Sequence, residues 1–285
     1  LWKSNRLDAK IINGWDFGLD DDLVVSRSKE IKYKRYIKSG GIVGFSTHVG
    51  CSNGCPYCIE SKKRVYYRQI VEVIKEIESL TNKGYSNFHL CDSEFNEDLE
   101  YSKKFCRAII KKSFDFKWTL YMKPSPYDEE LFDLLNKSNA YLITLSVDSD
   151  KKIQSDNNYS YNDLEKIIKY CKKYNIELAV DLLTGFPGES IQSTRKVIDF
   201  FRKNRTKTVG INFYYRLFRS TELTLLIDKN PFMHRKLTRL YSKEENYLKP
   251  IFYSQYTKEG IEELILDDSL FKIPGITPGV NYQQG

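Results

Sequence analysis

A run of apolar residues long enough to cross a bilayer, roughly eighteen, is missing from the sequence. We therefore expect no membrane span. The amino-terminal residues also lack the basic start, apolar stretch and small-residue cleavage site of a secretory signal. These two absences predict a protein of the reducing cytoplasm.

Low-complexity tracts and blocks of like charge are missing as well. The 45 Lys and Arg outnumber the 38 Asp and Glu, which gives a net charge of +7, and the two signs are interspersed along the chain. Such a balance permits an anionic partner but does not require one. Disorder is excluded, because 41% of the residues are hydrophobic and 16 Phe and 21 Tyr are available for a core.

Short apolar or β-branched runs recur from residue 42 onward, and helical patterns lie between them. The clearest helical stripes cover 68–83, 161–174 and 191–203, and Ser160 with Asp163 forms a capping signal for the second. This alternation predicts an α/β protein with parallel strands, either a partial (β/α)6 TIM-like barrel or an open doubly wound sheet. The predicted strands are 42–47, 86–91, 116–122, 140–147, 176–183 and 208–215.

The same pattern divides the chain of 285 residues into three parts. Residues 1–40 are polar and aperiodic and are interpreted as a lead-in or linker, and residues 41–225 form the core barrel. Residues 226–285 form a C-terminal extension that shapes the substrate side, with a helix near 257–266. Because the chain starts at Leu1 and not at Met, we expect that a partner domain is missing upstream.

Three of the six cysteines are crowded into one loop directly after the first predicted strand. Cys51, Cys55 and Cys58 have the spacing C-x3-C-x2-C, with Gly50 and Gly54 beside them. Thiolates are soft ligands that suit zinc or an iron–sulfur cluster. In parallel α/β folds, ligands bind at the carboxyl ends of the strands, where this loop lies.

Three interpretations of the loop compete. A zinc site needs a fourth ligand, and although His48 is near, the second ligand pair of a structural zinc site is missing. A thiol–disulfide motif at Cys55 and Cys58 leaves the third cysteine without a role. A 4Fe-4S cluster held by three cysteines leaves one iron open to a small chelating ligand, and we favour this interpretation.

The cysteine spacing, with Tyr57 before the third cysteine, resembles the cluster loop of radical S-adenosylmethionine (radical SAM) enzymes. The resemblance covers residues 40–225 and implies a partial (β/α)6 barrel. It also implies that Cys51, Cys55 and Cys58 bind a 4Fe-4S cluster whose unique iron is chelated by SAM. An electron donor such as flavodoxin or ferredoxin would then allow cleavage of SAM to a 5′-deoxyadenosyl radical.

The resemblance also assigns residues at later strand ends to SAM. Glu94 stands where the family has the Glu of a Gly-Gly-Glu segment, which binds the amino group of SAM. The alternative role for Glu94 is capping of the next helix, a task that Asn96 or Asp98 could also fill. The remaining SAM contacts implied by the family are Tyr57, Ser146 and Asp148, and Gly185 of the Gly-Phe-Pro-Gly-Glu turn, where loop capping or a simple turn is the alternative.

Three further residues are candidates without a specific motif. Lys123 follows the third strand and is expected either to reach a carboxylate of SAM or substrate or to be solvated. Cys91 lies at the edge of the site or is buried and inert, and Tyr214 shapes the pocket. Cys106 and Cys171 fall on apolar helical stripes and are expected in the core.

The segment from Arg216 to Leu223 resembles the branch that contains cobalamin-dependent enzymes and tRNA methylthiotransferases. The favoured function is therefore methyl transfer, or functionalisation of a C–H bond, on a small molecule or peptide with cobalamin. A tRNA-modifying, methylthiotransferase-like enzyme is the alternative, although no basic and aromatic patch for nucleic acid follows residue 225. A non-catalytic iron–sulfur or zinc scaffold is the alternative of another class.

Overall fold

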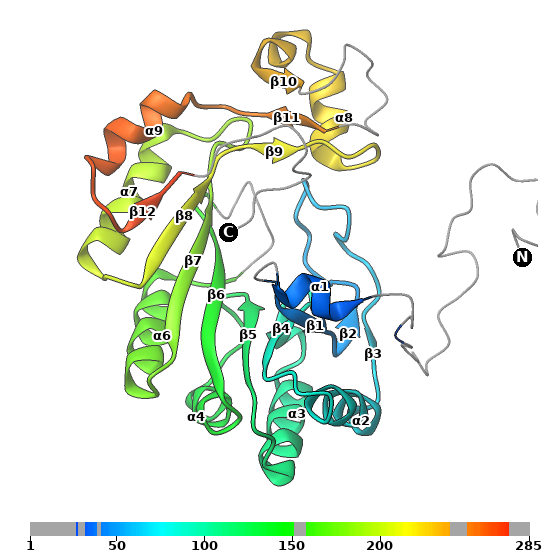
Figure 1. The fold of residues 1–285 in the computed structure, drawn as a ribbon. Coiled ribbons are helices and arrows are strands. Elements are labelled where there is room, and N and C mark those ends of the chain that lie inside the picture. Colours follow the sequence, from blue (N-terminus) through cyan, green and yellow to red (C-terminus); the bar gives the residue numbers. More distant parts are fainter. Residues whose placement is uncertain (1–26, 28–31, 39–40, 151–157, 240–249, 274–285) are drawn as a thin grey trace, which may run out of the picture.

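The computed structural model describes residues 27, 32–38, 41–150, 158–239 and 250–273. Its centre is a sheet of seven parallel strands in the order β1-β4-β5-β6-β7-β8-β12 (Figure 1). The strands are β1 Val43–Phe45, β4 Asn87–Leu90, β5 Lys117–Met122, β6 Ala140–Asp148, β7 Glu177–Leu183, β8 Thr208–Asn212 and β12 Phe271–Lys272.

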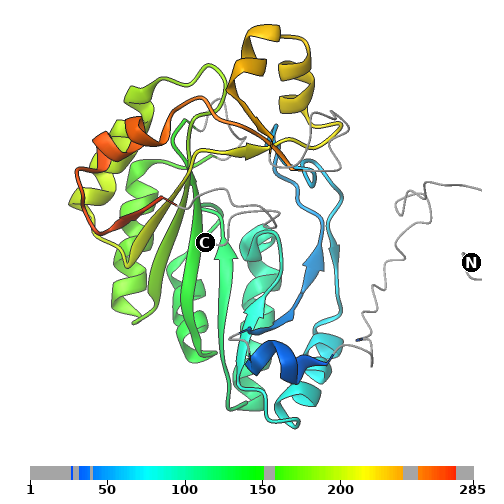
Figure 2. The same cartoon turned by 45° about the horizontal axis from the view of Figure 1, so that its top comes forward.

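Helices cover the convex face of this sheet, and the sheet curves without closing (Figure 2). Each covering helix is amphipathic and turns its apolar stripe inward, as α2 does with Val73, Ile74, Ile77 and Leu80. Helices on one face and a curved, open sheet are the features of a partial barrel, so the partial-barrel alternative is confirmed over the doubly wound one. The covering helices are α2 Ile70–Thr81, α3 Leu99–Lys112, α4 Glu129–Lys137, α6 Tyr161–Lys173 and α7 Ile191–Lys203.

Side chains alternate between the two faces of the strands. On β7, Val180 and Leu182 are buried in the core against the helices, and the half-buried Asp181 between them faces the concave side. Thr119, Tyr121 and Ser146 occupy the equivalent alternate positions on β5 and β6. The concave face of the main sheet therefore carries polar side chains.

A second, smaller sheet lies beyond the carboxyl ends of the main strands (Figure 1). Its antiparallel strands, in the order β10-β11-β9, are β9 Tyr215–Arg216, β10 Leu237–Arg239 and β11 Ile251–Tyr253. The short helix α8 Glu222–Asp228 and the 3-10 helix η4 Pro231–Lys236 pack with it around Leu217, Leu223 and Ile227. Helix α9 Lys258–Ile265 then leads to β12.

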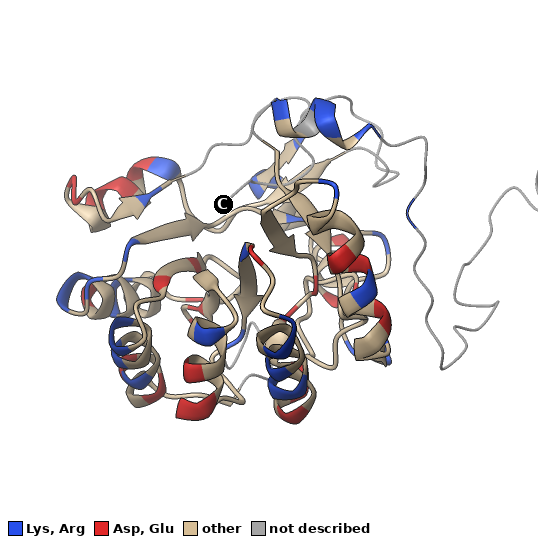
Figure 3. Ribbon diagram, turned by 60° about the horizontal axis from the view of Figure 1, so that its bottom comes forward, with Lys and Arg blue, Asp and Glu red and all other residues tan. Residues whose placement is uncertain are grey.

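Charged side chains are interspersed on the outer helices, where blue and red segments alternate in Figure 3. None of the described helices has the length and apolar character that crossing a membrane requires.

The structure confirms the predicted strands and helices and corrects three details. The sixth strand stops at Asn212, because Tyr215 and Arg216 leave the main sheet and pair with β11. The C-terminal extension does not only pack against the barrel: its β12 joins the main sheet beside β8. The lead-in is not wholly irregular, since Tyr33–Lys38 form helix α1. Residues 1–26, 28–31 and 39–40 of the lead-in and residues 240–249 and 274–285 of the extension lie outside the described residues.

Candidate active site

The cysteine loop is closed at its base by two short antiparallel strands, β2 His48–Val49 and β3 Tyr66–Tyr67. Inside it, the Lys63 amide donates to the Cys51 carbonyl at 2.9 Å and the Lys62 amide donates to the Asn53 carbonyl at 2.9 Å. Gly50 has φ +92°, and a Cβ there would lie 2.2 Å from the Arg64 carbonyl oxygen. Only glycine fits that position, so the loop geometry depends on it.

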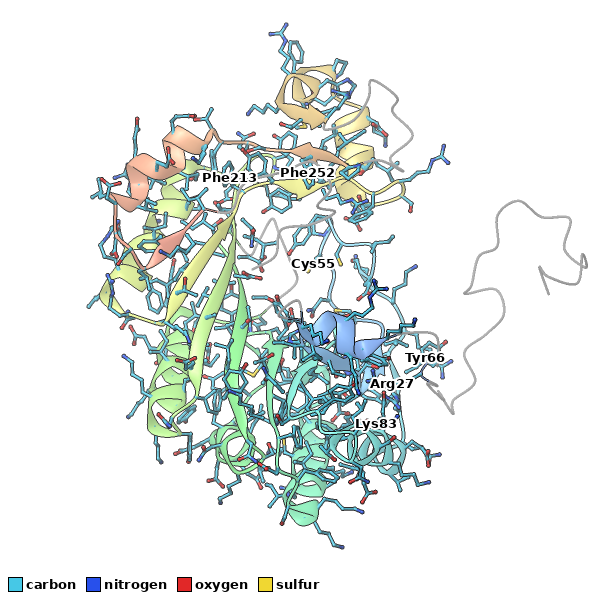
Figure 4. All side chains as sticks on the ribbon, in the orientation of Figure 1. Arg27, Cys55, Tyr66, Lys83, Phe213 and Phe252 are labelled. Carbon is cyan, nitrogen blue, oxygen red and sulfur yellow. The ribbon has the colours of Figure 1, made fainter. Side chains whose placement is uncertain are left out.

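Burial disfavours the thiolate form of all three loop cysteines. It raises the pKa of Cys51 to about 11 and that of Cys55 to about 12, and it also raises the pKa of Cys58. A bound metal group stabilises the thiolates that burial disfavours. Among the described residues, no three His, Cys, Asp or Glu side chains converge as a single-ion site. The fit of the loop to a cluster rests on its three free thiols and on the place of Cys55 between the main sheet and the small sheet (Figure 4).

Tyr57 connects the cysteine loop to the rest of the site. Its hydroxyl donates to Asp148 Oδ1 at 3.4 Å, and its ring packs 5.1 Å from the ring of Tyr215 and 6.5 Å from that of Phe186. The Leu223 amide donates to the Pro56 carbonyl at 2.9 Å. The small sheet and α8 therefore cover one side of the loop.

Glu94 follows β4 and is a buried carboxylate with an unpaired oxygen. Its Oε2 has no hydrogen-bond partner among the described residues. Burial, with a smaller contribution from Asp148, raises the pKa of Glu94 to about 8 against the opposing hydrogen bond from Ser146. Since buried polar atoms are nearly always paired, this oxygen is suited to a ligand that donates a hydrogen bond.

The capping alternative for Glu94 does not agree with the structure. Glu94 precedes the 3-10 helix η3 Phe95–Glu97 without a side-chain capping bond. Asp98 caps α3 instead and accepts a bond of 2.8 Å from the Tyr101 amide. The Asn96 side chain holds the loop after β5, accepting from the Lys123 amide at 3.0 Å.

Lys123 is buried, so the solvated alternative is wrong, and its ammonium group is paired within the protein. Its Nζ donates to Glu97 Oε2 at 2.7 Å and to Asn53 Oδ1 at 3.1 Å. Glu97 Oε1 in turn accepts the Ser52 amide at 2.7 Å. Burial raises the pKa of Glu97, but the bonds from Lys123 and Ser52 outweigh burial and hold that pKa below its ordinary value. Sequence reasoning missed Glu97, because nothing in its spacing marks it as a partner of β5.

The Gly185 turn is organised by its own glutamate. Glu189 Oε2 accepts the amides of Gly185 at 2.8 Å and Phe186 at 3.1 Å, and Oε1 accepts the Thr184 hydroxyl at 3.1 Å. Gly185 has φ +80°, and a Cβ on it would lie 3.1 Å from the ring of Tyr256. The turn is therefore tight and places backbone at the carboxyl end of β7.

Sequence reasoning also missed Asp92, which joins the first two strands of the sheet. Its Oδ1 accepts the Thr47 amide at 2.7 Å, and its Oδ2 lies 3.2 Å from His48 Nδ1. Its position two residues after the end of β4 was the available signal.

The remaining candidates separate by exposure. Cys91 is exposed and not buried, and its sulfur lies against Gly44. Cys106 and Cys171 are buried in the core, as predicted. Tyr214 packs on Phe213 with ring centroids 4.2 Å apart, and its neighbour Tyr215 is the one that contacts Tyr57.

A family model described as the Radical SAM superfamily matches residues 45–201, more than half of the chain. The tryptophan 2-C-methyltransferase of Streptomyces laurentii is 28% identical over 64% of this chain and 34% of its own length. A tRNA-2-methylthio-N(6)-dimethylallyladenosine synthase of Petrotoga mobilis is 24% identical over 58% of this chain and 42% of its own length. The chain thus spans less than half the length of these curated relatives.

Solved structures agree with this fold. The radical SAM methyltransferase TsrM of Kitasatospora setae, solved with cobalamin and a 4Fe-4S cluster, superposes with a TM-score of 0.78 at 21% identity. The match covers 92% of this chain and 61% of that one. A spore photoproduct lyase superposes with a TM-score of 0.54 at 12% identity, over 88% of this chain and 87% of that one. With the cysteine loop at the carboxyl end of a partial barrel and a family model matching residues 45–201, the chain belongs to the radical SAM superfamily.

Proposed function

We propose that this chain is the catalytic barrel of a radical SAM enzyme that, with cobalamin, transfers a methyl group to a small molecule or peptide or functionalises one of its C–H bonds. The observation that carries the proposal is the three-cysteine loop facing Glu94, a buried carboxylate with one oxygen unpaired among the described residues. Three thiols and one acceptor for an ammonium group are what a cluster and SAM need from the protein.

The predicted cluster ligands and SAM contacts each have a place in this proposal, whereas Lys123, Cys91 and Tyr214 are given no role in it. Cys51, Cys55 and Cys58 would hold the 4Fe-4S cluster, and Glu94 would accept hydrogen bonds from the amino group of SAM. When bound, the cluster and SAM supply the electron-transfer or methyl-donor chemistry, whereas the protein binds, orients and excludes water. The residues that would line the rest of the SAM site are Tyr57, Ser146, Asp148 and Gly185.

Methyl transfer is supported by two relatives of the same kind. The relative from Streptomyces laurentii is named as a tryptophan C-methyltransferase, and TsrM has been solved with tryptophan and a SAM analogue as well as with cobalamin. We infer that the substrate here is likewise a small molecule or peptide. A flavodoxin or ferredoxin would serve as electron donor where reduction of the cluster is required.

The test is anaerobic purification and reconstitution with iron and sulfide. The proposal expects a brown protein that binds SAM and, with dithionite, releases 5′-deoxyadenosine or S-adenosylhomocysteine. The first product indicates radical cleavage, and the second indicates methyl transfer. A colourless protein that holds one zinc would overturn the proposal in favour of a scaffold, and failure of any longer native form to bind cobalamin would remove the cobalamin part.

The tRNA-modifying alternative is kept because relatives such as the one from Petrotoga mobilis are named as tRNA-2-methylthio-N(6)-dimethylallyladenosine synthases. Other relatives are named as methylthiotransferases of ribosomal protein uS12. It predicts binding of bulk tRNA that weakens with salt, since phosphate contacts release counterions. A gel shift without such binding would exclude it.

A further inference from the structure

The concave face of β7 and β8 carries polar groups that the proposed SAM site does not use. Asp181 lies in the middle of β7 and faces this side, because Val180 and Leu182 are buried in the core on the other. Its register neighbours are Ser146 on β6 and Gly210 on β8. Asp181 is therefore one strand away from Ser146, which hydrogen-bonds to Glu94.

Gly210 leaves space beside the Asp181 carboxylate. A Cβ at Gly210 would lie in ordinary van der Waals contact with Asp181 Oδ1 at 3.4 Å and with the Val180 carbonyl oxygen at 3.8 Å, so the absence of a side chain leaves the space beside the carboxylate open. Within the described parts of the chain, Asp181 has no hydrogen bond and no ion pair. Because Asp181 is half-buried, its carboxylate is open to the concave side and can accept hydrogen bonds from a ligand there.

Asn212 adds a second unpaired acceptor to the same face. It lies two residues beyond Gly210 on β8 and pairs in register with Leu183, two residues beyond Asp181. Its Oδ1 is buried without a partner among the described residues. Unpaired acceptors on neighbouring strands call for a ligand that brings several donors.

The charge on this face favours a cationic ligand. Asp148 and Asp181 face it from β6 and β7, whereas the nearby cation Lys123 is already held by Glu97. The neighbouring Tyr121 phenol stays neutral, because burial and the charges of Asp181 and Glu94 raise its pKa. An anionic group would meet repulsion here, and a protonated amine would meet attraction.

We propose that Asp181 and Asn212 form a subsite for a protonated amine of the substrate, so that the proposed reaction acts on a small aminated molecule held over Gly210. This inference rests on the proposed function. The subsite is separate from the acceptor for SAM, because Glu94 lies on the opposite side of Ser146 from Asp181. An ammonium group at this point would anchor the substrate beside the cofactor.

The test is binding of matched probe pairs to the cluster-reconstituted chain with SAM present, measured by ligand-observed NMR. The pairs are tryptamine and tryptophol, 2-phenylethylamine and 2-phenylethanol, and hexylamine and hexanol. We expect wild type to bind an amine at least about tenfold more tightly than its alcohol. Asp181→Asn should abolish that preference, and Asn212→Ala should weaken it.

Two further variants separate charge from structure. Glu177→Gln neutralises an exposed carboxylate on the same strand, which pairs with Lys207, and should leave the preference unchanged. Gly210→Ala keeps the Asp181 charge but narrows the space beside it, and should weaken amine binding several-fold without unfolding the protein.

The proposal is overturned if no amine is preferred by wild type, if Asp181→Asn keeps the preference, or if Asp181→Asn weakens SAM binding as much as amine binding. The last result would assign Asp181 to the SAM site. Failure of the proposed function is recognised separately, as absence of the cluster or of SAM turnover in wild type.

Discussion

Lys123 Nζ lies 2.7 Å from Glu97 Oε2, and both side chains are almost fully buried, with 7% and 3% of their surface exposed. This pair connects the end of β5 to the cysteine loop, because Lys123 also donates to Asn53 and Glu97 accepts the Ser52 amide. Both loop residues directly follow the first cysteine. The pair therefore fixes the position of the loop relative to the sheet.

Replacement of Lys123 by Met is expected to destabilise the fold and displace the loop. Glu97 would remain buried without its cation, and breaking a buried pair in this way costs roughly 3–5 kcal/mol. Urea unfolding should show a loss of free energy in that range, and iron and sulfide incorporation should fall.

The matched control is Lys137→Met. Lys137 pairs with Asp133 on the surface of α4, with 57% and 32% of the side chains exposed, so its loss should cost less than about 1 kcal/mol. If Lys123→Met unfolds at the same urea concentration as Lys137→Met, the buried pair of Lys123 and Glu97 does not stabilise the fold.

Substitution of Glu94 by Gln should change how stability depends on pH in the cofactor-free protein. Burial raises the pKa of Glu94 to about 8, well above the value of about 4.5 for an exposed glutamate. Between these values the folded protein keeps a proton that the unfolded chain has lost. The contribution of Glu94 to stability is therefore fully present below about pH 4.5 and declines as the pH rises toward 8.

Urea unfolding of wild type and Glu94→Gln from pH 4.5 to 8 measures this contribution. Wild type should lose stability relative to the variant as the pH rises, and Glu94→Gln should also bind SAM more weakly. Parallel curves for the two proteins would show that Glu94 titrates normally.

Replacement of Cys51, Cys55 or Cys58 by Ala should remove the brown colour and SAM cleavage, because each thiol is proposed as a cluster ligand. Cys106→Ala and Cys171→Ala should keep both, since these thiols are buried in the core. Their cost is a loss of packing, on the order of 1–2 kcal/mol. Iron content and the absorbance spectrum distinguish the two groups, and a colourless Cys106→Ala protein that is still folded would contradict the assignment.

Alanine at Gly185 should destabilise the protein more than alanine at Gly188. Both glycines have positive φ, +80° and +87°, so each substitution costs roughly 1–2 kcal/mol of backbone strain. At Gly185 the new Cβ also lies 3.1 Å from Tyr256, whereas nothing lies within 4 Å at Gly188. Because of this contact, Gly185→Ala should have a lower melting temperature than Gly188→Ala. Equal melting temperatures would indicate that the Tyr256 side chain moves away at no cost.

The partial barrel was predicted from the family resemblance, since periodicity alone left the doubly wound sheet open. The sequence itself predicts the alternating strands and helices and the cysteine loop at a strand end. These features depend on local patterns: apolar periodicity, the Ser160 and Asp163 capping box and the spacing of three cysteines. The core positions of Cys106 and Cys171 followed from the same periodicity. Local physics is sufficient there, because the period of a helix or strand decides which side chains are buried.

Which groups distant in the sequence come into contact depends on the tertiary structure. The partners of Lys123 are Glu97 and Asn53, 26 and 70 residues away, and no local pattern announces such contacts. Likewise, β12 joins the main sheet although it lies near the C-terminal end of the described chain. Asp181 lies beside Gly210 because of the register in which β7 and β8 pair. Register and long-range packing place buried polar groups together, and these groups carry the proposed SAM and amine sites.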